Sequence, residues 1–181
     1  FDSGRKVGLT IFADSDPSFD YQAPAGQWVH LAFVATADGT ALFVNGAYVD
    51  SIWETLALPL DYFGSSPQIP GDQLAADIDE LRVWTVARSD GDLAGNFRRS
   101  LRGDEPGLVG YWRCDSAAGG WTPNGAAAGW VGAGIVAGAT LQADTAPLQP
   151  EFVVSRRDVA VPENGFALVG VRLDRAPSAP V

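Results

Sequence analysis

The sequence contains no methionine, one cysteine and one histidine in its 181 residues. Because Phe1 cannot begin a translation product, we expect either a processed N-terminus or an internal part of a longer chain. The single cysteine, Cys114, cannot form an internal disulfide. One cysteine and one histidine, His30, are also too few to form a Cys/His zinc site within the chain.

Basic residues are also scarce. The chain has 12 Lys and Arg against 22 Asp and Glu, a formal net charge of −10. Nucleic-acid binding requires a basic surface to meet phosphates, so we expect no nucleic-acid partner. No apolar run approaches the roughly 20 residues that a membrane-spanning helix needs, so we expect no membrane insertion.

Apolar residues make up 46% of the chain, enough for a packed core. They alternate with polar residues in short runs separated by Gly, Pro, Asn and Asp, which predicts strands. The clearest hairpin is 40–50, where Asn45-Gly46 is typical of a tight type I′ turn. The other predicted strands are 6–12, 28–35, 78–84 and 108–112. This pattern predicts a β-sandwich.

One short helix is predicted over about 90–100. Ser89 offers an N-cap hydroxyl with Asp92 three residues later, which is close to a capping box, and Gly103 supplies a stop. Further along, 145–150 has the composition of a linker. A new alternating pattern then covers 151–173, with a second Asn-Gly turn at 164–165. About 30 residues are too few to bury a core alone.

Three segments together carry a family resemblance. They are GQWVHLAFV (26–34), TALFVNGAYVD (40–50) and IDELRVWTVARSDGDL (78–93), followed by LRGDEPGLVGYWRCDSAAGGW (101–121). In order and spacing they resemble the laminin G-like branch of the concanavalin A-like lectin/glucanase jelly rolls. The resemblance implies an all-β, antiparallel jelly-roll β-sandwich with one short helix over 1–148, with the N-terminal strands of the family mostly missing.

The remaining residues, 149–181, resemble a linker followed by the first strands of a second β-sandwich, of the Calx-β-like or immunoglobulin-like kind. Together the two resemblances imply a secreted, multi-module protein at the cell surface or outside the cell. We therefore expect a non-catalytic adhesion or assembly module, with neighbouring modules or copies of itself as partners, and a glycan as a further partner. The alternatives are a carbohydrate-binding module of a secreted glycoside hydrolase and a structural repeat of an extracellular filament.

An enzymatic role is not expected. Related jelly-roll glucanases place three carboxylates on one face of a strand. Here Asp77 and Asp79 share one face, whereas Glu80 falls on the opposite face, so the third carboxylate is missing. A catalytic triad would have to use His30, which lies in a predicted strand without a nucleophile elbow. We interpret His30 as a structural residue.

Calcium is the one cofactor that the resemblance implies, since relatives bind it at the rim of the sandwich. Calcium needs 6–8 oxygen ligands. Two acidic groups could supply some of them, the first in FADSDPSFDY (12–21) and the second near the strand 78–84. Their members are Asp14, Asp16 and Asp20, and Asp72, Asp77 and Asp79. Alternatively these acids are solvated loop residues, with Asp79 bonding nearby backbone.

The six tryptophans divide into two groups. Trp28, Trp84 and Trp112 occupy recurrent strand positions and are predicted to lie in the core. Trp53, Trp121 and Trp130 lie in less regular, Gly-rich stretches. Exposed aromatic faces stack against sugar rings, so these three are candidate ligand-binding residues. They could equally cap the sandwich or meet a neighbouring module.

Overall fold

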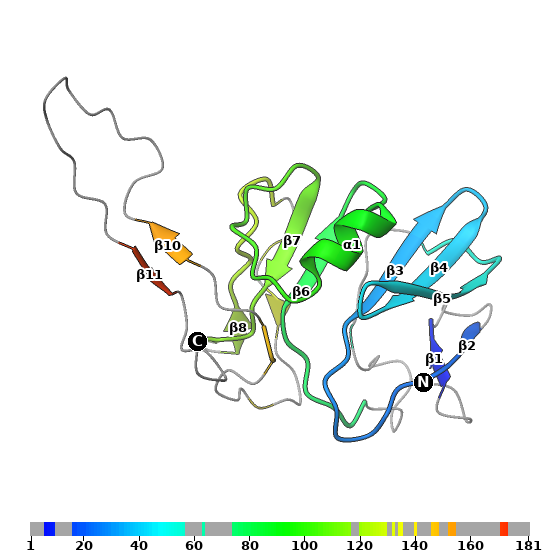
Figure 1. The fold of residues 1–181 in the computed structure, drawn as a ribbon. Coiled ribbons are helices and arrows are strands. Elements are labelled where there is room, and N and C mark those ends of the chain that lie inside the picture. The colour runs from blue at the N-terminus through cyan, green and yellow to red at the C-terminus, as the bar shows by residue number, and fades with distance from the viewer. Residues whose placement is uncertain are drawn as a thin grey trace, which may run out of the picture.

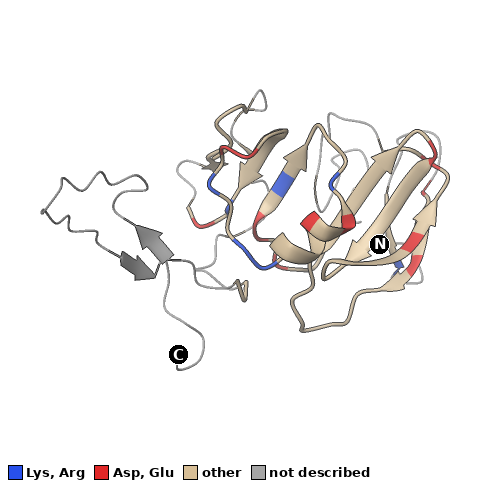
Figure 2. Ribbon diagram, turned by 45° about the horizontal axis from the view of Figure 1, so that its top comes forward, with Lys and Arg blue, Asp and Glu red and all other residues tan. Residues whose placement is uncertain are grey.

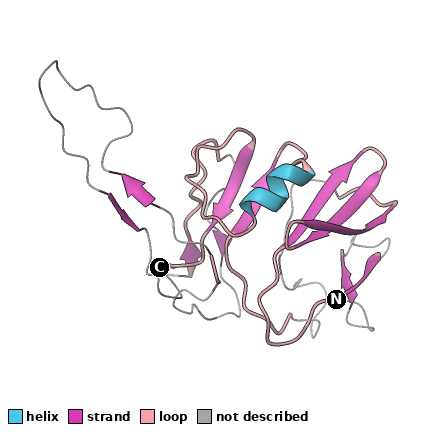
Figure 3. Ribbon diagram, viewed as in Figure 1, coloured by secondary structure: helices cyan, strands magenta, loops and turns pink. Residues whose placement is uncertain are grey.

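Within the residues that the structure describes, the protein is an antiparallel β structure with one short helix (Figure 1), as the sequence predicts. Its structure is a computed structural model, which describes residues 6–9, 16–56, 63, 74–116, 120–129, 132, 134–135, 140, 146–148, 152–154 and 171–173. Within these residues, strands make up most of the regular structure (Figure 3). The strands are β1 (Lys6–Gly8), β2 (Ser18–Gln22), β3 (Leu31–Thr36), β4 (Gly39–Val44), β5 (Ala47–Ile52), β6 (Leu81–Trp84), β7 (Leu108–Trp112), β8 (Trp121–Thr122), β9 (Gly134–Ile135), β10 (Phe152–Val154) and β11 (Val171–Leu173).

The largest sheet has the order β3-β4-β5. Its second hairpin turns at Asn45-Gly46, with φ of 49° and 80°, as the sequence predicts for a type I′ turn. One face of this sheet packs on the β1-β2 hairpin around the fully buried Phe19 and Leu42. A bulge between Leu42 and Phe43 breaks the regular pairing of β4 with β5.

Helix α1 spans Asp90–Asn96. The predicted cap is confirmed, because the Ser89 hydroxyl accepts a 3.2 Å hydrogen bond from the Asp92 amide. The helix ends earlier than predicted, with Phe97 as its C-cap. Gly95 and Asn96 are poor helix formers, so the last turn has little intrinsic propensity to continue. The basic residues that follow Phe97 therefore lie outside the helix.

The β6-β7 pair forms a second sheet, and β7 is buried along its whole length. Strand β6 begins at Leu81 rather than at residue 78, because Glu80 has a φ of +54° that no strand accommodates. The second edge of β7 is closed by a side chain. The Asn124 amide accepts from the Tyr111 amide at 2.9 Å and donates to the Val109 carbonyl at 3.1 Å.

Two further pairs are small. Strand β8 pairs with β9, and β10 pairs with β11, both antiparallel. The second pair agrees with the alternating pattern of 151–173, although the turn at 164–165 lies outside the described residues. That this hairpin opens a second sandwich, with a boundary between 148 and 149, stays a prediction.

Candidate binding site

The most exposed large aromatic side chain in the described structure is Trp53, at 91% exposure. It follows directly after β5, at the end of the β3-β4-β5 sheet. An apolar side chain of this size, left in water, stabilises nothing inside the domain. Trp53 is therefore available to a ligand or a partner.

The backbone around Trp53 is held firmly although the side chain is free. The buried Thr40 donates from its hydroxyl to the Glu54 carbonyl at 2.6 Å and accepts from the Leu56 amide at 2.9 Å. Thr55 adds a 3.0 Å bond from its hydroxyl to the Thr36 carbonyl. These bonds fix the segment on which the indole stands, so a ligand would meet a positioned platform.

Polar groups lie on the neighbouring turn. Asp38 is exposed in the β3-β4 turn and caps it by donating its amide to the Thr36 hydroxyl at 3.2 Å. Thr55, two residues after Trp53, is also exposed. A sugar has apolar ring faces and hydroxyl rims, so an exposed aromatic side chain with polar residues nearby is the kind of surface on which it can bind.

The other candidate tryptophans do not join Trp53. Trp121 is half exposed, at 50%, on β8. Figure 1 shows β8 and β5 on opposite sides of α1, so the two side chains form separate sites. Trp130 lies outside the described residues.

Of the tryptophans predicted in the core, Trp112 is buried and Trp84 is half-buried against a core cluster. The prediction for Trp28 is wrong, because Trp28 is 37% exposed. It precedes the first paired residue of β3, Leu31, and so lies beyond the part of the strand that the sheet covers.

The first acidic group is dispersed. Asp16 and Asp20 are exposed, and Asp20 forms a 2.9 Å ion pair with Lys6, which lowers the pKa of the Asp20 carboxyl. The backbone amide of Asp20 donates to the Asp50 carboxylate at 2.7 Å, and this bond connects β2 to β5. Asp14 lies outside the described residues.

In the second acidic group, Asp77 is exposed and Asp79 is half-buried, while Asp72 lies outside the described residues. The Asp79 carboxylate accepts from the Glu80 amide at 2.8 Å. Burial raises the pKa of Asp79. Within the described ranges no three His, Cys, Asp or Glu side chains gather as a metal site would require. Calcium binding stays a prediction.

A buried polar network, which the sequence pattern does not predict, joins the start of β6 to β7. The Tyr111 hydroxyl donates to Glu80 Oε2 at 2.7 Å, and Arg82 forms an ion pair with the same oxygen at 2.8 Å. The Glu80 and Arg82 side chains are each only 10% exposed. Six arginines fall between residues 82 and 113, and Figure 2 shows basic residues concentrated around β6 and β7. This concentration of arginines in an acidic chain is the feature of the sequence that points to internal ion pairs.

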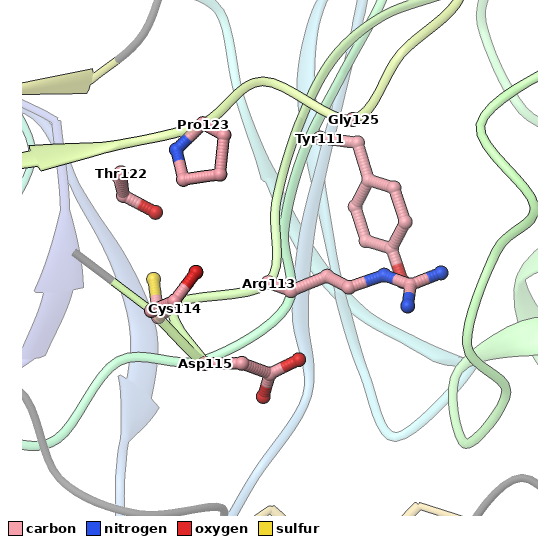
Figure 4. A pocket seen from close by; sticks show the side chains of 8 residues that line it. Tyr111, Arg113, Cys114, Asp115, Thr122, Pro123 and Gly125 are labelled. Carbon is pink, nitrogen blue, oxygen red and sulfur yellow. The ribbon is translucent and has the colours of Figure 1, made fainter. Parts of the chain in front are cut away.

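A small cavity of about 110 Å³ lies beside this network. Figure 4 shows Arg113 extending over the Tyr111 ring, and Cys114 and Asp115 on another side of the cavity. Burial, together with nearby carboxylates, raises the pKa of the Cys114 thiol, so the thiolate is disfavoured. Sites for small organic ligands usually enclose about 300 Å³ or more. This cavity is too small for a sugar ring with its contacts.

His30 is packed between elements. Its ring centroid lies 6.0 Å from that of Phe97, and its amide donates to the Asn45 side chain at 3.0 Å. Burial, with a smaller effect from Arg82, lowers the pKa of His30 to about 4. These contacts are those of a neutral imidazole that links β3, the Asn45 turn and α1.

The concanavalin A-like lectin/glucanase superfamily is the family whose model matches the chain, over residues 7–94. The match confirms the resemblance carried by the segments from 26 to 93. The family supports a carbohydrate-binding or adhesion-type module in general. Searches of curated proteins and of solved structures found no match. No helix in the described part of the chain is long and apolar enough to cross a bilayer.

Proposed function

We propose that this protein is a non-catalytic adhesion module of a larger extracellular protein, and that it binds a glycan through Trp53. The observation that carries the proposal is the 91% exposure of Trp53 on a backbone fixed by Thr40 and Thr55. The family match supports it, since carbohydrate binding is among the functions of that superfamily.

The charge of the chain supports a neutral or hydroxyl-rich ligand. A net charge of −10 opposes the approach of sulfated or otherwise anionic glycans. Asp38 and Glu54, next to the platform, would accept hydrogen bonds from sugar hydroxyls. We therefore expect neutral oligosaccharides, bound mainly by stacking and by hydroxyl-to-carboxylate hydrogen bonds.

The proposal is tested on a glycan array with the 181-residue protein and two variants. Trp53→Ala removes the platform, and Trp121→Ala is the matched control, because it removes an exposed tryptophan from a different strand. We expect wild type and Trp121→Ala to retain the same neutral glycans and Trp53→Ala to lose them. Equal loss in both variants, or no glycan bound by the wild type, would overturn the proposal.

A further inference from the structure

Two exposed aromatic side chains belong to one short segment of the chain. Tyr48 lies near the start of β5, and Trp53 follows directly after this strand. Tyr48 is 56% exposed and Trp53 is 91% exposed. In a regular strand, residues an odd number of positions apart point to opposite faces of the sheet. The two aromatic side chains would then be unable to contact the same ligand.

The bulge in the β4-β5 pair changes this. Tyr48 and Asp50 pair with consecutive residues of β4, so that Val49 between them has no partner. An extra residue of this kind shifts the alternation by one position and redirects the side chains beyond it. Ser51 therefore points to the same side as Tyr48. The 3.2 Å hydrogen bond from the Tyr48 hydroxyl to the Ser51 hydroxyl shows this directly.

Trp53 continues the same row. Ile52, which lies between Ser51 and Trp53, packs against the core cluster of Leu42 on the opposite face. Because successive side chains alternate, Trp53 turns to the side of Ser51 and Tyr48. We call these three residues the β5 strip. With the bulge residue left out, the strip covers four residue steps, or roughly 13 Å along the strand.

The Tyr48 side chain is held in place although more than half of it is exposed. Its ring packs edge-on against Phe43, at 5.8 Å between centroids and 80° between planes, and Phe43 is buried. Its hydroxyl is fixed by Ser51. A side chain that is already ordered loses little rotamer freedom when a ligand binds. Tyr48 is thus a second positioned platform beside Trp53.

The middle of the strip can exchange hydrogen bonds with a sugar hydroxyl. The Tyr48 hydroxyl uses its one proton for Ser51, so its oxygen still accepts, and the Ser51 hydroxyl still has a proton to donate. A sugar hydroxyl is both a donor and an acceptor. It can therefore bind both groups of this exposed pair, between the two aromatic rings.

The face of the sheet that carries the strip has no charge on its paired residues. On this face, opposite the core cluster of Leu42, the three strands place Ala32, Val34, Ala41, Phe43, Tyr48 and Ser51. A charged polymer would find no countercharge on these side chains, and the net charge of −10 opposes anions in particular. A neutral chain with apolar ring faces and hydroxyl groups fits the surface better.

We infer that the ligand is a linear, neutral polysaccharide that lies extended along β5 and is bound through internal rings. One ring stacks on Trp53, another stacks on Tyr48, and a hydroxyl between them binds the Tyr48-Ser51 pair. About three rings of an extended chain cover the roughly 13 Å of the strip. The inference rests on the proposed function, and it adds the class of glycan and a second contact residue.

The first test is the dependence of affinity on chain length. Oligosaccharides of one to six rings, made of β-1,4-linked glucose, xylose or mannose, are titrated into the 181-residue protein and followed by NMR. In at least one series we expect affinity to rise at least about tenfold between two and four rings. The Tyr48 ring signals should shift only with the longer chains. Full affinity at two rings, or no binding by any series, would overturn the inference.

The second test removes Tyr48 from the strip. Tyr48→Leu keeps an apolar side chain over Phe43 but lacks the flat ring and the hydroxyl. We expect chains of four or more rings to bind this variant at least about tenfold more weakly, and two-ring chains to bind it like the wild type. Tyr48→Phe, which lacks only the hydroxyl, should lose less. Wild-type affinity of Tyr48→Leu for the long chains would refute the strip.

Two further variants separate this inference from the proposed function. Trp121→Ala removes an exposed tryptophan outside the strip and should bind all chains like the wild type. Trp53→Ala should lose chains of every length. If Trp53→Ala loses binding while Tyr48→Leu keeps it, the strip is wrong and the proposed function stands. If Trp53→Ala binds every glycan like the wild type, the proposed function fails, and the strip fails with it.

Discussion

The Tyr111 hydroxyl donates a 2.7 Å hydrogen bond to Glu80 Oε2, across 31 residues of sequence. The same hydroxyl accepts from the Leu101 amide at 3.0 Å. Arg82, paired with Glu80, also donates to the carbonyls of Asn96 and Arg99. One buried network thus connects the segment after α1 to the β6-β7 sheet. Glu80, which belongs to the acidic segment that resembles a glucanase motif, has a structural role in this network.

Removal of the hydroxyl in Tyr111→Phe should destabilise the protein by about 1–3 kcal/mol, because it leaves the Leu101 amide and a buried carboxylate short of a partner. The measurement is urea unfolding followed by tryptophan fluorescence. Tyr48→Phe is the control, since Tyr48 is 56% exposed and its hydroxyl contacts only Ser51 in the described structure. A Tyr111→Phe cost no larger than that of the control would contradict this role for the network.

Breaking the ion pair should cost more than removing the tyrosine hydroxyl. Glu80→Gln leaves the Arg82 guanidinium buried without a countercharge, and such changes cost about 3–5 kcal/mol. The double variant Glu80→Gln/Arg82→Met removes the stranded charge and should recover part of the loss. The measurement is the free energy of unfolding in urea. If the loss in the double variant equals the sum of the losses in Glu80→Gln and Arg82→Met, the two residues are not coupled.

Gly46 should tolerate no side chain, for two separate reasons. Its φ is +80°, and a Cβ there would lie 2.7 Å from the Ala94 Cα of helix α1. Gly26 isolates the first reason, because its φ is +69° and a Cβ at that position would have no described atom within 4 Å. Gly26→Ala should therefore cost about 1–2 kcal/mol, and Gly46→Ala clearly more.

Thermal or urea unfolding of the two glycine variants makes this comparison. Equal costs would mean that helix α1 does not press on the Asn45-Gly46 turn as the structure has it. A larger loss for Gly46→Ala, accompanied by loss of the contact between Phe97 and His30, would support the observed packing.

The stability of the protein should fall as the pH drops from about 6.5 to 4 because of His30. Its pKa is about 4 in the folded protein and about 6.5 when unfolded, so the unfolded state binds the extra proton first. The full shift corresponds to about 3 kcal/mol. Urea midpoints at neutral pH and near the folded pKa of about 4 should differ more for the wild type than for His30→Gln. An equal difference in both proteins would show that carboxyl groups alone cause it.

The local features of the fold follow from the sequence, whereas the long-range ones do not. The Asn45-Gly46 turn and the Ser89 cap depend on neighbouring residues, and both are found as predicted. The positive φ of Glu80 shortens β6, and no alternation pattern carries that information. The exposure of Trp28 depends on where the sheet ends, which the recurrent position of a tryptophan does not specify.

The candidate site is only partly predictable for the same reason. Trp53 is a candidate because it lies in an irregular stretch, and its exposure agrees with that interpretation. Glu80 and Arg82 are only two residues apart in the sequence, but their partner Tyr111 comes from a strand about 30 residues later. Side-chain networks between distant strands need the fold before they can be recognised.

We propose Trp53 as the platform on which a glycan binds. Its most direct test is the dissociation constant of the strongest array glycan for wild type, Trp53→Phe and Trp53→Ala. Loss of a dominant contact costs about 2 kcal/mol, or about thirtyfold in affinity. We predict that loss for Trp53→Ala, an intermediate affinity for Trp53→Phe, and unfolding free energies within about 0.5 kcal/mol of the wild type. Unchanged affinity in Trp53→Ala would contradict the claim.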